Sequence, residues 1–156
     1  AFRPTICADA VTLPLERESL CALVAMNASI HYLCSTEELL QHFNECARVL
    51  DTQGVYIFDV CPVERACALS GRTQYALSGS VKFAHEFKSP FLTTWVFLKN
   101  EGKEIVEEHR QRIFSVDEIL TAIQSSAFLL EGFEENYGLL PQNNAAPFMA
   151  YVLHKV

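Results

Sequence analysis

Long apolar runs are missing from the sequence, and so is the pattern of a secretion signal. No apolar stretch approaches the roughly 18 residues that a helix needs to span a bilayer. The first residues carry neither the basic start nor the apolar run of a signal peptide. These absences predict a soluble, cytoplasmic chain that has no membrane partner.

Positive charge is scarce and scattered. The chain has 12 Lys and Arg residues against 19 Asp and Glu residues, a formal net charge of -7, and no basic cluster. A protein that binds nucleic acid normally presents a basic surface to the phosphates. We therefore expect no nucleic-acid partner, and a neutral, basic or small-metabolite partner instead.

Paired metal or redox motifs are missing as well. The six cysteines form no C-x-x-C pair, and all lie in the first half of the chain, mostly in segments typical of buried strands or helices. We expect reduced, buried thiols rather than disulfides or metal ligands. The five histidines show no ligand spacing, so no metal site is predicted. The cysteines are Cys7, Cys21, Cys34, Cys46, Cys61 and Cys67.

The first part of the chain has the pattern of an α/β fold, and 156 residues fit one domain. Residues 6–10 (ICADA) and Leu20 to Met26 (LCALVAM) are apolar runs of strand length. A capping box at Ser35 to Glu38 predicts a helix to about Leu50. Gly54 is suited to a left-handed cap before a strand from Val55 to Val60. This order predicts a βαβ crossover with parallel strands, Leu20 to Met26 being central in the sheet.

The second part alternates like antiparallel hairpins. A short helix over 63–69 precedes alternating runs at 73–77, 81–87, 92–98 and 104–114, separated by breakers at Ser78-Gly79, Ser89-Pro90 and Asn100 to Gly102. A second capping box, Ser115 to Glu118, opens another helix. Strands near 129–137 and 148–154 end the chain. We divide the single domain into a core (1–70), an insert (71–114) and a C-terminal helix with a strand pair (115–156).

This order of elements resembles the C-terminal two thirds of a class I S-adenosylmethionine-dependent methyltransferase. The resemblance is carried by CADAVTLPL, SLCALVAMNASIHYL, ARVLDTQGVYIFDV, EEHRQRIFSVDEI and FLLEGF. It is greatest to small-molecule methyltransferases with an antiparallel hairpin insert. The fold that it implies is a Rossmann-like methyltransferase sheet without its first two strands, with the hairpin insert and a C-terminal antiparallel strand pair.

The resemblance implies a set of cofactor contacts for S-adenosylmethionine. Asp9 and Ala10 match the positions that meet the adenine, although Asp9 alternatively caps a turn. Met26, Asn27 and His31 match the loop that passes beside the sulfonium, although His31 alternatively only packs at the start of the helix. This loop follows a parallel strand, where open α/β sheets bind ligands.

The acceptor side is assigned to the insert. Trp95 is a candidate wall of the acceptor pocket, although an aromatic stripe at strand spacing is also typical of a core. Similarity to an E-x-H-x-x-R pattern places His109 and Arg112 toward the substrate, whereas alternation puts them on opposite faces of a strand. An amine or alcohol acceptor must lose a proton, for which His31 and His109 are the catalytic candidates.

The glycine-rich loop of such enzymes is absent, since no two of the six glycines are close enough for G-x-G. We therefore expect a fragment of a longer enzyme that binds little cofactor by itself. Residues 6–10 would dock on the apolar edge of Leu20 to Met26, or this edge would be covered in a homodimer or by strand exchange. One alternative is a non-catalytic partner that dimerises through its sheet, and another is a nucleotide-dependent oxidoreductase, which does not explain the insert.

Overall fold

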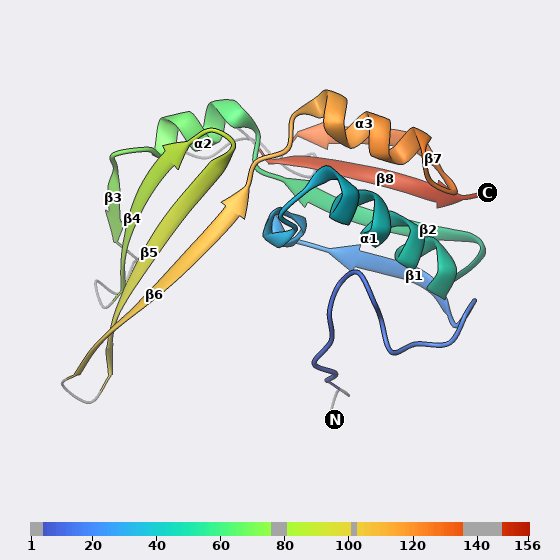
Figure 1. The fold of residues 1–156 in the computed structure, drawn as a ribbon, viewed down its shortest axis with the longest axis horizontal. Coiled ribbons are helices and arrows are strands. Elements are labelled where there is room, and N and C mark those ends of the chain that lie inside the picture. Colours follow the sequence, from blue (N-terminus) through green and yellow to red (C-terminus); the bar gives the residue numbers. More distant parts are fainter. Residues whose placement is uncertain (1–4, 76–80, 101–102, 136–147) are drawn as a thin grey trace.

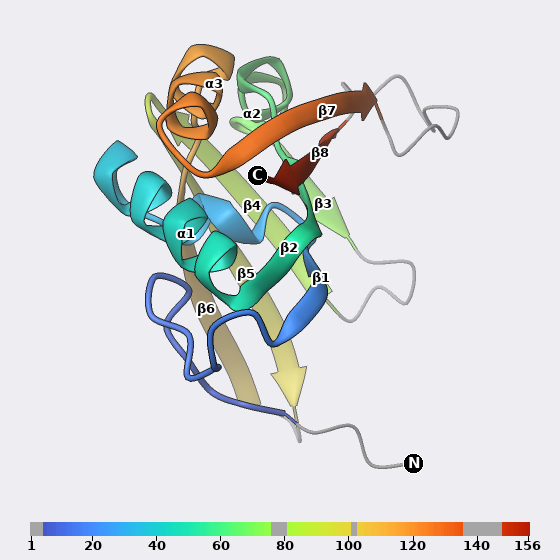
Figure 2. The ribbon, with the colours of Figure 1, turned by 90° about the vertical axis from the view of Figure 1, so that its right-hand side faces the viewer.

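The structure is a computed structural model that describes residues 5–75, 81–100, 103–135 and 148–156. Within these residues two four-stranded sheets are present, and the helices α1 and α3 lie on the same face of the first sheet (Figure 1, Figure 2). The predicted turns at Ser78-Gly79 and Glu101-Gly102 lie outside the described residues, and so do residues 76–77 and 136–137 of two predicted strands.

The first sheet confirms the predicted crossover and the C-terminal strand pair. Its strands run in the order β1-β2-β8-β7, with β1 parallel to β2 and the other pairs antiparallel. Helix α1 connects β1 to β2, and α3 precedes β7. The bounds are β1 Leu20–Ala25, α1 Thr36–Val49, β2 Leu50–Val60, α3 Val116–Gln124, β7 Phe128–Glu135 and β8 Met149–Lys155.

Both predicted helix starts are found where the capping residues stand. The Ser35 side chain accepts a hydrogen bond from the Glu38 amide, and Ser115 and Glu118 form a complete capping box. Each cap satisfies amides that the first turn of a helix leaves free. The apolar faces of α1 and α3 then pack against the sheet.

An aromatic cluster forms the main core under these helices. Phe43 from α1 contacts Tyr56 and Phe58 from β2, and Phe58 stacks on Tyr151 from β8 with ring centroids 5.0 Å apart. All four side chains are buried. Truncating a buried phenylalanine such as Phe43 to alanine typically costs about 3–5 kcal/mol.

The second sheet is the predicted insert. It is antiparallel in the order β3-β4-β5-β6. A smaller core, which includes Ala28, Cys61, Ala66, Leu92 and Ile113, joins it to the end of the first sheet. The bounds are η1 Ser29–Tyr32, α2 Val63–Leu69, β3 Thr73–Tyr75, β4 Val81–Lys88, β5 Phe91–Asn100 and β6 Lys103–Arg112.

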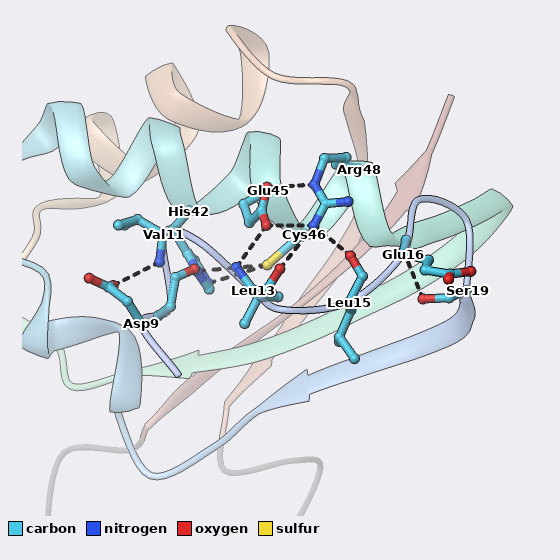
Figure 3. A network of polar contacts seen from close by, with 11 residues as sticks. Asp9, Val11, Leu13, Leu15, Glu16, Ser19, His42, Glu45, Cys46 and Arg48 are labelled. Carbon is cyan, nitrogen blue, oxygen red and sulfur yellow. Dashed lines mark hydrogen bonds and ion pairs between the residues drawn. The ribbon is translucent and has the colours of Figure 1, made fainter. Parts of the chain in front are cut away.

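Residues 6–10 are not a strand, contrary to the prediction. Asp9 makes only an isolated bridge with Thr12, and the segment lies alongside helix α1 in space (Figure 3). Side chains of α1 bind the backbone of this segment and of the residues after it, because His42 Nδ1 lies 2.8 Å from the Ala10 carbonyl and Glu45 accepts from the Leu13 amide. These contacts replace the ladder that a strand would need, so the segment does not dock on β1.

The turn before β2 also differs from the prediction. Strand β2 begins at Leu50, and Gln53, not Gly54, has the left-handed backbone, with a φ of 68°. Gly54 is required for space instead, since a Cβ there would lie 2.9 Å from the Leu50 Cβ. The expectation for the cysteines is wrong in part, because only Cys46 and Cys61 are buried.

Strand β1 lies at an edge of the first sheet, not in its centre. Among the described residues β1 pairs only with β2, so its other edge is open. Val24 is 58% exposed on the face opposite the helices. Leu129 of β7 is 61% exposed on the same face. The apolar pattern of this sheet is therefore only partly covered by the described chain.

Two further absences concern the described residues only. None of their helices combines the length and the apolar character that crossing a bilayer requires. No group of three or more His, Cys, Asp or Glu side chains in them is placed to hold a metal ion.

Candidate functional site

The loop after β1 is held in a strained conformation by a buried carboxylate. Asn27 and Ala28 both have left-handed backbones, with φ of 59° and 56°. Non-glycine residues rarely adopt this conformation. Asp59, fully buried at the end of β2, accepts hydrogen bonds from their amides at 3.0 and 2.5 Å. The two neighbouring strand ends are thus fixed to each other.

His31 locks this loop to the second sheet. Its Nε2 accepts a hydrogen bond from the Cys61 amide at 2.9 Å, and its Nδ1 lies 2.5 Å from the Arg112 carbonyl. Since the first nitrogen accepts, Nδ1 must carry the proton and donate it. Burial lowers the pKa of His31 to about 4, against the effect of the Arg112 hydrogen bond. The ring is therefore neutral near pH 7, and both of its nitrogens are occupied.

A cavity of about 210 Å³ lies beside this loop. Its polar walls include Asn27, His85, Thr94 and Gln111, and its apolar walls include Leu92 and Phe148. It is placed at the carboxyl ends of β1 and β2, the ligand-binding edge of an open α/β sheet. Larger hollows of about 390 and 460 Å³ lie along α1, away from this edge. We take the smaller cavity as the candidate site because of its position.

Three side chains of the second sheet form one row across its strands. His85 pairs with Thr94, and Thr94 pairs with His109. Directly paired residues share a face of the sheet. His109 lies beyond the cavity walls, where its Nδ1 is 2.7 Å from the Tyr32 hydroxyl and its Nε2 is 3.4 Å from the Glu107 carboxylate. Burial, and then Glu107, raise the pKa of Tyr32.

The predicted alternation along β6 is confirmed by the register. Trp95 lies on the face opposite to Thr94 and His109, and its indole donates to Glu108 at 2.9 Å. Arg112 is also on that face and forms an ion pair with Glu118 at 2.6 Å. The structure therefore does not bring Trp95, His109 and Arg112 to one wall. Their predicted contacts with an acceptor stay predictions.

The predicted adenine contacts lie on the segment beside α1. Asp9 is exposed and accepts from the Val11 amide at 3.0 Å, which is the turn contact considered as its alternative role. The Ala10 carbonyl lies 2.8 Å from His42 Nδ1, and His42 Nε2 lies 2.7 Å from the Tyr56 hydroxyl. Met26 is half-buried directly after β1. The cofactor role of these residues remains a prediction.

Asp59 and His85 were missed by the sequence analysis. The signal for Asp59 was its place at the end of an apolar strand, because a carboxylate buried there must accept hydrogen bonds from nearby groups. His85 had no such signal, because a single histidine in an alternating strand is unremarkable until its cross-strand partner is known.

The chain is similar in structure to solved methyltransferases. An S-adenosylmethionine-dependent methyltransferase from Clostridium acetobutylicum matches with a TM-score of 0.80 and 16% identity, over 96% of this chain and 63% of its own. The CcbJ methyltransferase from Streptomyces caelestis matches with a TM-score of 0.76 and 11% identity, over 97% of this chain and 63% of its own. A sugar N-methyltransferase from a Streptoalloteichus species matches with a TM-score of 0.67 and 16% identity, over 93% of this chain and 60% of its own.

No family model matches the sequence, and no curated protein is significantly similar to it. At such identities the likeness concerns the fold. The chain spans less than two thirds of the length of these structures. Over that span, the chain has the Rossmann-like fold of the class I S-adenosylmethionine-dependent methyltransferases, as the sequence predicted.

Proposed function

We propose that this chain is the acceptor-side part of an enzyme that transfers a methyl group from S-adenosylmethionine to a small molecule. The observation that carries the proposal is the cavity at the carboxyl ends of β1 and β2, walled by the insert sheet, in a chain with a methyltransferase fold. Its volume of about 210 Å³ is enough for a small acceptor group.

Three observations support the view that the whole enzyme is longer than this chain. The chain spans 63% of the length of two structures that it resembles. The described part of the chain leaves one edge of β1 and one apolar face of the first sheet uncovered. Parallel strands are normally covered on both faces. The sequence also contains no closely spaced glycines for a cofactor loop.

The residues present fit one end of the cofactor only. The exposed Asp9 carboxylate can accept from an exocyclic amine, and His42 holds Ala10 beside it. Met26 and Asn27 would line the edge of the cofactor next to the acceptor cavity. When bound, the cofactor supplies an electrophilic methyl group on a sulfonium. The remaining contacts belong to the part of the fold that this chain does not span.

We assign the histidines two different roles. His31 is a positioning residue, because both of its nitrogens bind backbone groups and neither is free for a substrate. His109 is the candidate that takes a proton from an amine or alcohol. Its side chain is 35% exposed, the Tyr32 hydroxyl orients Nδ1, and the acceptor would displace Glu107, whose carboxylate lies 3.4 Å from Nε2. The rest of the rate gain would come from positioning the acceptor and excluding water.

The test uses the protein extended upstream in its reading frame. It is incubated with S-adenosylmethionine and a set of amine, alcohol and carboxylate metabolites, and the release of S-adenosylhomocysteine is measured. We expect release that depends on one acceptor class. An extended protein that binds the cofactor but methylates no metabolite, and only stimulates another methyltransferase, would contradict the proposal.

That outcome would support a second candidate, a non-catalytic partner that dimerises through its sheet. The open edge of β1 favours it, because an unpaired strand is a template for pairing with another chain. A homodimer or an exchanged strand would cover Leu20 to Met26. Sedimentation of the 156-residue chain measures this directly, and a concentration-independent monomer excludes it.

A further inference from the structure

His85 lines the candidate cavity and has a ring nitrogen without a hydrogen-bond partner in the described part of the chain. Its Nδ1 lies 2.9 Å from the Thr94 hydroxyl, so that one side of the ring is fixed by the neighbouring strand. Its Nε2 is buried and has no hydrogen-bond partner among the described residues. A buried polar atom without a partner is costly, so that such an atom in a cavity wall indicates a group that arrives from outside.

The surroundings of His85 are polar but almost uncharged. Thr94, Gln111, Gln74 and Asn27 contribute a hydroxyl and three amides. No carboxylate lines the cavity within the described residues, and burial lowers the pKa of His85, which keeps the ring neutral. Among the described wall residues Arg65 alone is charged, and its guanidinium lies 4.3 Å from the centre of the Phe148 ring.

This set of groups selects among ligand chemistries. Imidazole, hydroxyl and amide groups each donate and accept hydrogen bonds, as a ligand hydroxyl does, whereas an ammonium only donates and a carboxylate only accepts. The apolar side, formed by Leu92 and Phe148, requires one unsubstituted face on the ligand. The volume of 210 Å³ equals that of about seven waters, the size of a single ring.

We propose that this cavity binds an uncharged, hydroxyl-bearing small molecule of about one ring, with its hydroxyl on His85 Nε2 and its apolar face on Leu92 and Phe148. Thr94 sets the orientation of His85 and thereby the selectivity. The proposal rests on the proposed function only in naming this molecule as the methyl acceptor. Binding itself needs no methyl donor.

The experiment follows the histidine side chains by two-bond ¹H–¹⁵N NMR of the 156-residue chain. Phenol, benzylammonium and benzoate serve as probes, because they share a ring and differ in the polar group. We expect phenol to shift the His85 nitrogens saturably and to leave His154, on the first sheet, unchanged. The two charged probes should bind at least tenfold more weakly.

Variants of Thr94 test the orientation without removing His85. Thr94→Val keeps the shape but loses the hydroxyl and should weaken phenol binding about fivefold, the effect of one hydrogen bond. Thr94→Ser keeps the hydroxyl and should restore most of the affinity, which separates this effect from misfolding. Equal binding of the three probes, equal binding by Thr94→Val, or no shift at His85 would overturn the proposal, the last meaning that only water meets Nε2.

These outcomes are independent of catalysis. Phenol binding in a protein whose extended form transfers no methyl group would leave this inference standing and refute the proposed function. Methyl transfer to an acceptor without any response at His85 would do the reverse.

Discussion

The Cys61 amide donates a hydrogen bond to His31 Nε2 over 2.9 Å, in the interior between the two sheets. Because the other ring nitrogen donates to the Arg112 carbonyl, a single neutral side chain joins the loop after β1 to the ends of β2 and β6. Protonating this ring would set an N–H donor against the Cys61 amide. The link between the sheets is therefore sensitive to acid.

Stability should fall when the pH is lowered from about 6.5 to about 4. The pKa of His31 is lowered in the folded state from 6.5 to about 4, so the unfolded chain takes up the proton first, and stability is complete only above pH 6.5. The loss should approach about 3 kcal/mol. Urea unfolding at a series of pH values measures it. His31→Gln should start less stable and show a shallower acid loss, whereas His154→Gln, at a half-buried position on the interior strand β8, should retain the full slope.

Asp59→Asn should destabilise the loop after β1. An amide can accept from one of the two backbone amides but directs its NH₂ group against the other, and its charge is lost. We expect a loss of about 1–3 kcal/mol in urea unfolding. Asp117→Asn, exposed in the first turn of α3, is the matched control and should lose about 0.3–1 kcal/mol. Equal losses in the two variants would show that Asp59 does not hold the loop.

Removing the Tyr56 hydroxyl should loosen the segment that contains Asp9 and Ala10. The hydroxyl meets His42 Nε2 at 2.7 Å, and the other nitrogen of that ring meets the Ala10 carbonyl. Tyr56→Phe leaves this buried nitrogen with only the Cys46 thiol, 3.5 Å away, as a weak partner, which costs about 1 kcal/mol. Faster hydrogen exchange at the Thr12 amide, which donates to the Asp9 carbonyl, would report the loosening. Tyr75→Phe, at an exposed position, should change neither quantity.

Local sequence signals predicted where helices and strands lie better than they predicted which elements lie next to one another. The serines that cap α1 and α3 fix helix starts through contacts within one turn, which a sequence pattern contains. The prediction for residues 6–10 failed because an apolar run becomes a strand only where a partner strand exists, and here His42 of α1 binds the Ala10 carbonyl instead.

The site was predictable in position but only partly in composition. The family resemblance pointed to Asn27 and His31 in the loop after a parallel strand, and the structure places Asn27 in the cavity wall and His31 in the adjoining interior. Their contacts with the cofactor stay predictions. The environment of His31 was not predictable, because its partners Cys61 and Arg112 are 30 and 81 residues away. Likewise the contact of His85 with Thr94 was not predictable, because it depends on the register between β4 and β5.

His109→Gln should impair catalysis in the upstream-extended protein. If His109 takes the proton of the acceptor, the turnover number should fall about 100-fold or more, with little change in cofactor affinity. Tyr32→Phe, which removes the group 2.7 Å from His109 Nδ1, should cause a smaller loss. Trp95→Phe is the control on the opposite face of the sheet. A lower turnover number in Trp95→Phe without one in His109→Gln would place the acceptor on the face of the sheet that carries Trp95.

Calorimetry with S-adenosylhomocysteine shows where the binding surface for the donor is encoded. We expect micromolar binding by the upstream-extended protein and no measurable heat with the 156-residue chain. Micromolar binding by the 156-residue chain alone would contradict this expectation.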